Sequence, residues 1–249
     1  MAEHLRIGLV YPELLGTYGD RGNAEVLAWR AVRRGVAADV VEVRAPAPIP
    51  ADLDVYLLGG GEDAAQATAA DLLRSAAGDG LRQAVLEGRP VLAICGALQL
   101  LGRTYADGAG RRTEGLGLVD LHTQSGVPRL VGEVVIRTRE GELLTGFENH
   151  GGRTRLGRGV EPLGTVVLGA GNNGADGTEG IRQGALVGTY LHGPVLARNP
   201  FLADMLLGWV LSRRGVDPGT LRPLGPDPSG RLHDARLRAV RAEGGRRRR

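Results

Sequence analysis

Short apolar runs alternate with helix-like segments through the first hundred residues of the chain, and this alternation limits the possible folds more than any other feature. The apolar runs are rich in β-branched residues, and the segments between them carry apolar residues at helical spacing. The predicted strands are LRIGLVY (5–11), ADVVEV (38–43), DVYLLGGG (54–61) and PVLAIC (90–95), and the predicted helices span 23–34, 64–77, 80–87 and 96–105. This order predicts an α/β fold with a mostly parallel central sheet flanked by helices.

The pattern changes beyond residue 115, where apolar runs follow one another without long helices between them. These runs predict an additional antiparallel region or second layer. They are GLGLVDL (115–121), RLVGEVVIRT (129–138), ELLTGF (142–147), TVVLGA (165–170) and ALVGTYLHG (185–193). A last predicted helix spans 199–215, with Asn199 as a candidate N-cap and Gly215 as a stop.

Basic charge is concentrated at the C-terminal end. Residues 213–249 hold 11 of the 31 arginines against four acidic residues, whereas the rest of the chain has more acids than arginines. Because no aromatic-rich binding motif accompanies these arginines, we expect no nucleic-acid partner. The predicted division is a domain over residues 1–212 and a basic, Pro/Gly/Arg-rich tail over 213–249 that can include a helix.

The chain contains no lysine, and this absence excludes two classes of site. Neither a P-loop lysine nor a Schiff-base lysine is available, so we expect any ATP to be handled by another chain. A single cysteine cannot form an internal disulfide, no apolar run is long enough to span a bilayer, and no N-terminal run has the pattern of a signal peptide. We therefore expect a cytoplasmic protein with no transmembrane segment, and we predict no metal site.

The single cysteine, Cys95, lies where the predicted strand 90–95 turns into a helix. Ligands of open parallel sheets bind at the carboxyl ends of strands, and a helix N-terminus lowers the pKa of a nearby thiol. The small residues Ala93, Gly96 and Ala97 leave room for a sharp turn of the nucleophile-elbow type. Two interpretations follow: Cys95 is a catalytic nucleophile, or it is a small buried apolar residue.

Two further strand ends favour the catalytic interpretation. LLGGGED (57–63) places consecutive glycines after a strand, where backbone N–H groups can point into a cavity and stabilise an oxyanion. GTYLHGP (188–194) places His192 after another strand, from which an imidazole can act as general base toward Cys95. Taken singly, the glycine-rich segment also fits a simple tight turn, and His192 also fits a structural histidine.

AICGALQLLG resembles the nucleophile elbow of class I glutamine amidotransferases, and six further segments narrow the resemblance. They are YGDRGN (18–23), LLGGGED, EGLGLVDLHT, RLVGEVV, GFENHGGRT and GTYLHGP. In this order they resemble the CobB/CobQ-like glutaminase subunits of lipid II isoglutaminyl synthase, the GatD family, over about residues 6–210. The resemblance implies a flavodoxin-like class I glutamine amidotransferase fold, and GFENHGGRT with GTYLHGP is its most specific part.

The resemblance implies a glutaminase that works with a partner. Members of the family hydrolyse L-glutamine and pass the ammonia to a Mur-ligase-like subunit, MurT, with which they form a heterodimer. That partner binds ATP and Mg²⁺ and amidates the D-glutamate α-carboxyl of lipid II in peptidoglycan synthesis, so this chain is expected to hold no cofactor. By motif, Cys95 is implied as the nucleophile, His192 as the base, and the backbone around Gly60, Gly61 and Gly96 as the oxyanion site.

Four side chains are implied to contact substrate or to support the pocket. Arg129 matches the family arginine for glutamine, and a guanidinium suits the α-carboxylate because two N–H groups can meet two oxygens; otherwise it is an ordinary surface arginine. Gln99 is expected to face the pocket or to cap the turn. Asn149 and His150 are expected to contact substrate, or else to stabilise a glycine-rich loop.

The chain departs from the wider superfamily just after the histidine. Pro194 stands where many class I amidotransferases carry a glutamate, so no acid of the triad follows His192 in sequence. We expect Asp20, Glu148 or a carboxylate of the partner to orient His192 instead. If the partner supplies it, glutaminase activity is expected to be weak in the isolated chain.

Two alternatives remain open. An amidotransferase for another acceptor, such as a cobyric-acid-type substrate, would use the same site but is normally fused to an ATP-binding domain. A redox-sensing module of similar fold would use an oxidisable Cys95 without any need for His192. A cysteine protease fits less well, because the sequence does not indicate an extended peptide groove.

Overall fold

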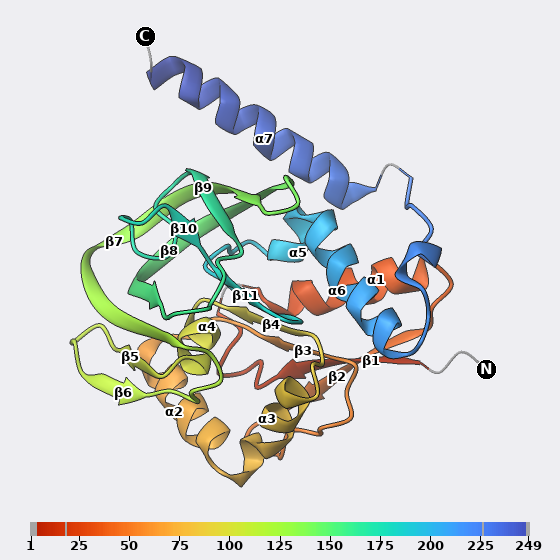
Figure 1. Ribbon diagram of the computed structural model, residues 1–249, viewed down its shortest axis with the longest axis horizontal. Helices are drawn as coiled ribbons and strands as arrows, with labels where there is room; N and C mark the ends of the chain where they lie inside the picture. The colour runs from red at the N-terminus through yellow and green to blue at the C-terminus, as the bar shows by residue number, and fades with distance from the viewer. Residues whose placement is uncertain (1–3, 18, 226, 248–249) are drawn as a thin grey trace.

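The computed structural model describes residues 4–17, 19–225 and 227–247 and shows two β-sheets with several helices (Figure 1). The first part contains β1 (Leu5–Val10), α1 (Arg21–Val32), β2 (Ala38–Val43), β3 (Val55–Leu58), α2 (Asp63–Arg74), a 3-10 turn (Ala76–Gly78), α3 (Asp79–Leu86), β4 (Val91–Ile94) and α4 (Gly96–Leu101). The second part contains β5 (Thr104–Ala106), β6 (Arg112–Glu114), β7 (Leu121–Thr138), β8 (Leu143–Leu156), β9 (Gly164–Leu168), β10 (Thr178–Glu179), β11 (Ile181–Gln183), β12 (Leu186–Thr189), α5 (Val195–Arg198), α6 (Pro200–Arg213), a 3-10 turn (Pro218–Thr220) and α7 (Pro228–Arg247).

The main sheet has six strands in the order β11-β12-β4-β3-β1-β2. Neighbouring strands are parallel except for β11, which pairs antiparallel with β12. Helices α1 and α6 lie on one face of this sheet, and α2 and α3 lie on the other (Figure 1). β3, β4 and β12 are buried at every residue, as expected for central strands that are covered on both faces. The predicted fold class, a mostly parallel central sheet flanked by helices, is confirmed.

The second sheet has the order β10-β9-β7-β5-β6, with β8 paired to β7. β7 and β8 form a long antiparallel pair whose register shifts between Ser125 and Leu130, so Arg129 lies in the irregular part of the ladder. A backbone bridge between Phe147 of β8 and His192, just after β12, joins the two sheets. The second sheet therefore reaches the edge of the main sheet at which β4 and β12 end.

Two segments that were predicted for the antiparallel region are arranged differently. ALVGTYLHG supplies β12, which pairs parallel with β4 in the main sheet. GLGLVDL is not a strand before Leu121, because the N–H groups of Leu116, Gly117 and Leu118 donate to carbonyls at the end of α4 and at Gly102. Both predictions were wrong because an apolar run does not reveal which distant backbone it will pair with.

The helix predicted over 96–105 is shorter than expected. α4 stops at Leu101, since the next residue, Gly102, is extended. Tyr105 is therefore not helical but pairs with Thr113 across the β5–β6 hairpin.

α6 begins at Pro200, directly after Asn199, as predicted. The Asn199 side chain does not cap the helix, because its amide bonds the backbone of Thr145 and Val195 instead. Gly215 follows the helix with φ +72°, a left-handed conformation that stops it.

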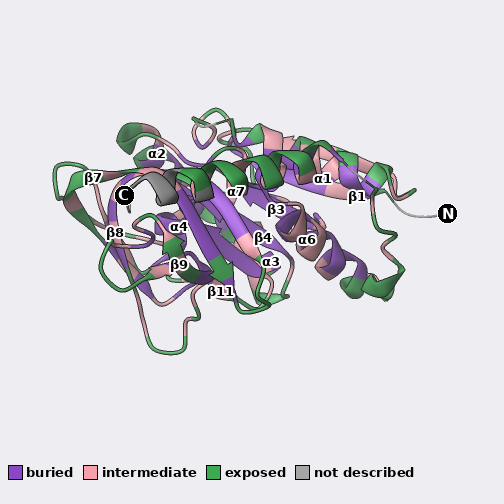
Figure 2. Cartoon of the chain, turned by 90° about the horizontal axis from the view of Figure 1, so that it is seen from above, coloured by how far each residue is buried: buried purple, intermediate pink, exposed green. Residues whose placement is uncertain are grey.

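The C-terminal segment contains α7, which lies over α5 and extends past the second sheet (Figure 1). Most of its described surface is exposed (Figure 2). Residues 248–249 of the terminal arginine run lie outside the described residues, and the division into a domain and a tail stays a prediction. No helix within the described part of the chain has the length and apolar character needed to cross a membrane.

Candidate active site

Cys95 sits at a strained turn between β4 and α4. Its backbone has φ +52° and ψ −105°, a combination that residues with a side chain rarely adopt. The Cys95 N–H donates to the carbonyl of Thr189 at the end of β12 at 2.8 Å, which ties the turn to the neighbouring strand. The residue lines a cavity of about 100 Å³. This is the geometry of a nucleophile elbow.

Two glycine backbones meet beside Cys95. A Cβ built on Gly96 would lie 2.8 Å from Oε1 of Gln66 and 3.3 Å from the backbone N of Gly61, so a larger residue would displace these groups. Gly61 also lines the cavity that holds Cys95. The backbones of Gly61 and Gly96 therefore lie close together beside Cys95, which suits an oxyanion site built from backbone N–H groups.

Asp20 fixes the glycine-rich loop from its buried side. The N–H of Gly60 donates to the Asp20 carboxylate at 2.8 Å, and a Cβ on Gly59 would lie 2.4 Å from the same carboxylate. Burial raises the pKa of Asp20 to about 6, and the bond from Gly60 opposes that rise. Because its N–H is bonded to Asp20, Gly60 shapes the loop, and Gly61 is the glycine of this loop that lines the cavity beside Cys95.

His192 follows β12, the strand beside β4. Its backbone N–H and C=O exchange hydrogen bonds with Phe147 at 3.0 and 3.2 Å. Burial lowers the pKa of His192 to about 4, and the charge of Arg129 adds to the shift. Cys95 and His192 thus follow adjacent parallel strands and lie at the same edge of the main sheet.

The end of β12 is anchored by a buried carboxylate that the sequence did not reveal. The hydroxyl of Thr189 donates to Glu179 at 3.0 Å, and the N–H of Tyr190 donates to it at 2.6 Å. Burial raises the pKa of Glu179 to about 7. Glu179 therefore holds the segment that supports the Cys95 backbone and leads to His192.

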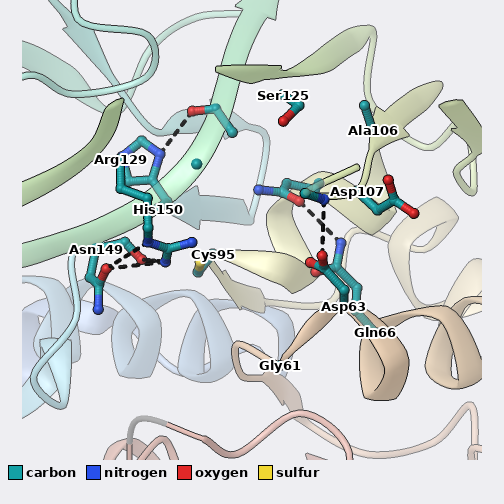
Figure 3. Close-up of a pocket in the computed structure, with 14 residues that line it drawn as sticks. Gly61, Asp63, Gln66, Cys95, Ala106, Asp107, Ser125, Arg129, Asn149 and His150 are labelled. Carbon is teal, nitrogen blue, oxygen red and sulfur yellow. Dashed lines mark hydrogen bonds between the residues drawn. The ribbon is translucent and has the colours of Figure 1, made fainter. Parts of the chain in front are cut away.

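The cavity beside Cys95 collects most of the predicted side chains (Figure 3). The predicted residues in its lining are Gly61, Cys95, Gln99, Arg129, Asn149 and His150. Asp63, Gln66, Asp107 and Ser125 also line it and were missed, since single polar residues on helices, strands and loops carry no distinguishing sequence signal. Among the described residues, three predicted members of the site, Gly60, Gly96 and His192, are not part of this lining. Nor does the described part of the chain hold a group of three His, Cys, Asp or Glu side chains placed to bind a metal.

Arg129 extends over the cavity from β7 and is held by Asn149 (Figure 3). The guanidinium donates to the backbone carbonyl of Asn149 at 2.8 Å and to its side-chain oxygen at 3.1 and 3.2 Å. Asn149 thus orients the arginine. The positive charge of Arg129 lowers the pKa of both the Cys95 thiol and the His192 imidazole.

A buried chain of hydrogen bonds supports the floor of the cavity. Gln66 donates to Gln99 at 3.0 Å, and Gln99 donates to the hydroxyl of Tyr190 at 3.1 Å. Tyr190, Thr154 and Thr123 continue the chain at 2.7 Å per step. Gln99 is therefore bonded at both ends of its amide and acts as a brace between α2, α4 and the second sheet.

His150 and Glu148 are both bonded within the second sheet. The His150 ring stacks on Tyr190 with centroids 3.7 Å apart, and its Nδ1 is 2.9 Å from the carbonyl of Gly152. Glu148 accepts two backbone N–H groups from the loop after β9 and lies 4.0 Å from Nε2 of His150. These contacts favour the loop-stabilising interpretation of His150, and they tie Glu148 to the loop.

The family of the chain follows from its similarity to known proteins. The model of the CobB/CobQ-like glutamine amidotransferase domain matches residues 6–200. The chain belongs to this family. A similar relative is the lipid II isoglutaminyl synthase (glutamine-hydrolyzing) subunit GatD of Staphylococcus aureus (strain N315), 42% identical over 203 residues that cover 81% of this chain and 82% of the relative. The GatD subunit of Streptococcus pneumoniae (strain ATCC BAA-255 / R6) is 37% identical over 214 residues, 84% and 82% of the two chains.

The similarity to GatD subunits predicted from the motifs is thus confirmed. Among solved structures, PurLQS from Thermotoga maritima superposes with a TM-score of 0.58 and 16% sequence identity, over 85% of this chain and 99% of that one. At this level of identity the match shows a shared fold.

In this CobB/CobQ-like amidotransferase, burial shifts the pKa of Cys95 and the pKa of His192 in the directions that favour the neutral thiol and the neutral imidazole. Burial raises the pKa of the Cys95 thiol to about 12, with Asp20 adding to the rise and the Gly96 N–H and Arg129 opposing it. The lowered pKa of His192 leaves the imidazole uncharged. Burial of the two side chains therefore disfavours a preformed thiolate–imidazolium pair in the chain by itself.

The raised pKa of the thiol predicts how the reactivity of Cys95 depends on pH. We expect the rate of alkylation by iodoacetamide in the isolated chain to rise about tenfold per pH unit between pH 7 and pH 9, because the thiolate fraction grows tenfold per unit well below the pKa. The rate is measured by mass spectrometry of the intact chain, which has one cysteine. A plateau near neutral pH would show a preformed thiolate and contradict the prediction.

Asp20 offers a test of the glycine-rich loop. We expect Asp20→Ala to lower kcat for glutamine hydrolysis by about tenfold with little change in KM, because the Gly60 N–H loses its acceptor and the oxyanion donors shift. Asp20→Asn keeps an oxygen for Gly60 and should retain most of the activity. Equal loss in the two variants would mean that Asp20 acts through its charge and not through the loop.

Proposed function

We propose that this chain is the glutaminase subunit of a lipid II isoglutaminyl synthase. In this proposal it hydrolyses L-glutamine and delivers ammonia to a Mur-ligase-like partner, MurT, in a cytoplasmic heterodimer. The observation that carries the proposal is the strained Cys95 in one cavity with Gly61 and the cationic Arg129. The proposed acceptor, lipid II, is supported by the similarity to two GatD subunits, each of which aligns with more than four-fifths of this chain.

The proposed reaction is acyl transfer through the thiol. His192 takes the proton of Cys95 as sulfur attacks the carboxamide carbon, and the N–H groups of Gly61 and Gly96 stabilise the tetrahedral oxyanion. His192 then gives the proton to the leaving nitrogen, so ammonia departs and a thioester remains. Water adds to the thioester with His192 again as base, which releases glutamate and restores the thiol. The net reaction is glutamine plus water to glutamate plus ammonia.

Arg129 is assigned to the α-carboxylate of glutamine. We expect Arg129→Ala to raise KM for glutamine about a hundredfold while kcat changes by less than about fivefold, because a charge-assisted contact outside the reacting bond is lost. Steady-state kinetics of glutamate release measure both constants. Arg137→Ala, in the regular part of the same strand, is the matched control, and an unchanged KM in Arg129→Ala would refute the assignment.

The neutral thiol and imidazole support a need for the partner. Asp20 is bonded to Gly60, and Glu148 is bonded to the loop after β9. A carboxylate from the partner near His192 would raise the pKa of the imidazole and favour thiolate formation. ATP and Mg²⁺ would be bound by that partner, which activates the D-glutamate α-carboxyl of lipid II.

The test is co-expression of the chain with the Mur-ligase-like subunit, followed by assays of glutamine hydrolysis and lipid II amidation. We expect a stable complex, glutaminase activity at least about tenfold above that of the isolated chain, and amidation that needs ATP, glutamine and Cys95. Amidation of a cobyric-acid-type substrate and not of lipid II would favour the first alternative. Absence of glutaminase activity, with reversible oxidation of Cys95, would favour the redox-sensing module.

A further inference from the structure

The segment that follows His192 is held in place from several sides. Its first residue pairs through the backbone with Phe147 of β8. The side chain of Asn23 on α1 accepts the N–H of Leu196 at 2.9 Å. Asn199 at the far end accepts the N–H of Thr145 at 2.7 Å. We call residues 192–199 the histidine segment, and these contacts fix it to the body of the domain.

Helix α7 provides a further contact to the same segment. Nδ1 of His233 on α7 lies 2.9 Å from the backbone carbonyl of Arg198, the last residue of α5. The guanidinium of Arg198 pairs with one oxygen of Glu133 on β7 at 2.5 Å, and Arg236 of α7 pairs with the other oxygen. Glu133 is thus shared between the histidine segment and α7.

Arg198 is also in direct contact with the residue next to His192. Gly193 has φ +132°, and a Cβ built there would lie 2.9 Å from Cδ of Arg198, so the aliphatic part of the arginine packs against the Gly193 backbone. Arg198 is buried, with a side-chain exposure of 7%. A shift of Arg198 would therefore be passed to Gly193 and to His192.

The start of α7 is anchored to the domain by buried charge. Asp227 pairs with Arg30 of α1 at 3.0 Å, and Arg30 also pairs with Asp204 of α6 at 2.8 Å. Ser229 in the first turn is buried as well. The outer part of α7 extends past the body of the fold (Figure 1), so the buried contacts of the helix concentrate near α5.

We infer that α7 is a positioning element for His192 and that Arg198 connects α7 to the backbone beside His192. The inference rests on the proposed glutaminase function, in which His192 must meet the Cys95 thiol. α7 lies beyond residues 6–200, the part of the chain that matches the family model, whereas Glu133 and Arg198 lie within that part. Loosening the contact to α7 would misplace the base without removing any group that binds glutamine.

The experiment compares Arg236→Ala with Arg238→Ala, an arginine of the same helix that is exposed. In the complex with the Mur-ligase-like partner, we expect Arg236→Ala to lower kcat for glutamine hydrolysis about tenfold with KM within about twofold, because small shifts of a catalytic group slow the reaction strongly. Arg238→Ala should match the wild type, and Arg236→Lys should recover at least about half of the lost rate because it keeps the charge. His233→Ala is a second, independent variant expected to act in the same direction.

Hydrogen exchange over residues 191–199 gives a readout that does not depend on activity. We expect faster exchange there in Arg236→Ala than in the wild type or Arg238→Ala. Unchanged exchange, a wild-type kcat, or a loss confined to KM would overturn the inference. If the wild-type complex fails to hydrolyse glutamine, the proposed function fails, and the exchange measurement still decides whether α7 holds the histidine segment.

Discussion

Cys95→Ala is expected to lower kcat for glutamine hydrolysis by at least ~10⁴-fold, because the nucleophile that forms the thioester is removed. Binding of glutamine should change little, since Arg129 and the cavity walls remain. Release of glutamate, followed with a coupled dehydrogenase assay, measures the rate. Any residual activity above about one per cent of the wild type would mean that another group attacks the carboxamide.

The strained backbone of Cys95 is tested by comparing two variants that both lack the thiol, Cys95→Ala and Cys95→Gly. At φ +52° a residue with a side chain is strained, whereas glycine adopts such angles readily. We expect the free energy of unfolding of Cys95→Gly to be about 1 kcal/mol higher than that of Cys95→Ala. Both variants lack the thiol and are expected to be inactive. Denaturant unfolding of the two variants measures the difference, and a less stable Cys95→Gly would contradict the assignment of strain to this turn.

His192→Gln is expected to lower kcat by about 10³-fold while KM stays within about threefold, because general acid–base transfer is lost but no glutamine contact is removed. The reaction needs a proton taken from the thiol and a proton given to ammonia, and a glutamine side chain can do neither. Rates are measured in the complex with the partner, where the wild-type rate is expected to be highest.

His4→Gln serves as the matched control, since His4 is exposed and pairs with Asp39 on the surface of the main sheet. It should retain the wild-type rate. A loss of less than about fivefold in His192→Gln, or a loss seen only in KM, would show that His192 supports the fold and is not the base.

The main sheet could be predicted from sequence because its central strands are short, continuous apolar runs that end at polar or glycine-rich turns. ADVVEV is a strand over the residues predicted, and the strand ends at Leu58 and Ile94 fall within a few residues of their predicted limits. The second sheet was harder to predict. Its strands pair across long distances, and the pairing of β7 with β8 shifts register between Ser125 and Leu130, so the apolar pattern alone does not give the order of the strands.

The candidate site could likewise be predicted from the sequence only in part. The structure brings Cys95, Gly61 and Arg129 into one cavity, and each of them lies in a motif with a recognisable chemical purpose. The roles of Asp20 and Glu179 could not be predicted, because each acts on backbone N–H groups that are distant in sequence or hidden in a loop. No periodic pattern marks a buried carboxylate of this kind.

Labelling with a glutamine-derived diazoketone, which alkylates the nucleophile that would attack the carboxamide, tests the proposed thiol–imidazole reaction most directly. Peptide mass spectrometry of the partner complex should find one adduct, on Cys95, that is absent in Cys95→Ala and forms at least about a hundredfold more slowly in His192→Gln. An adduct on any other residue, or equal labelling rates in the wild type and His192→Gln, would contradict a glutaminase built on these two side chains.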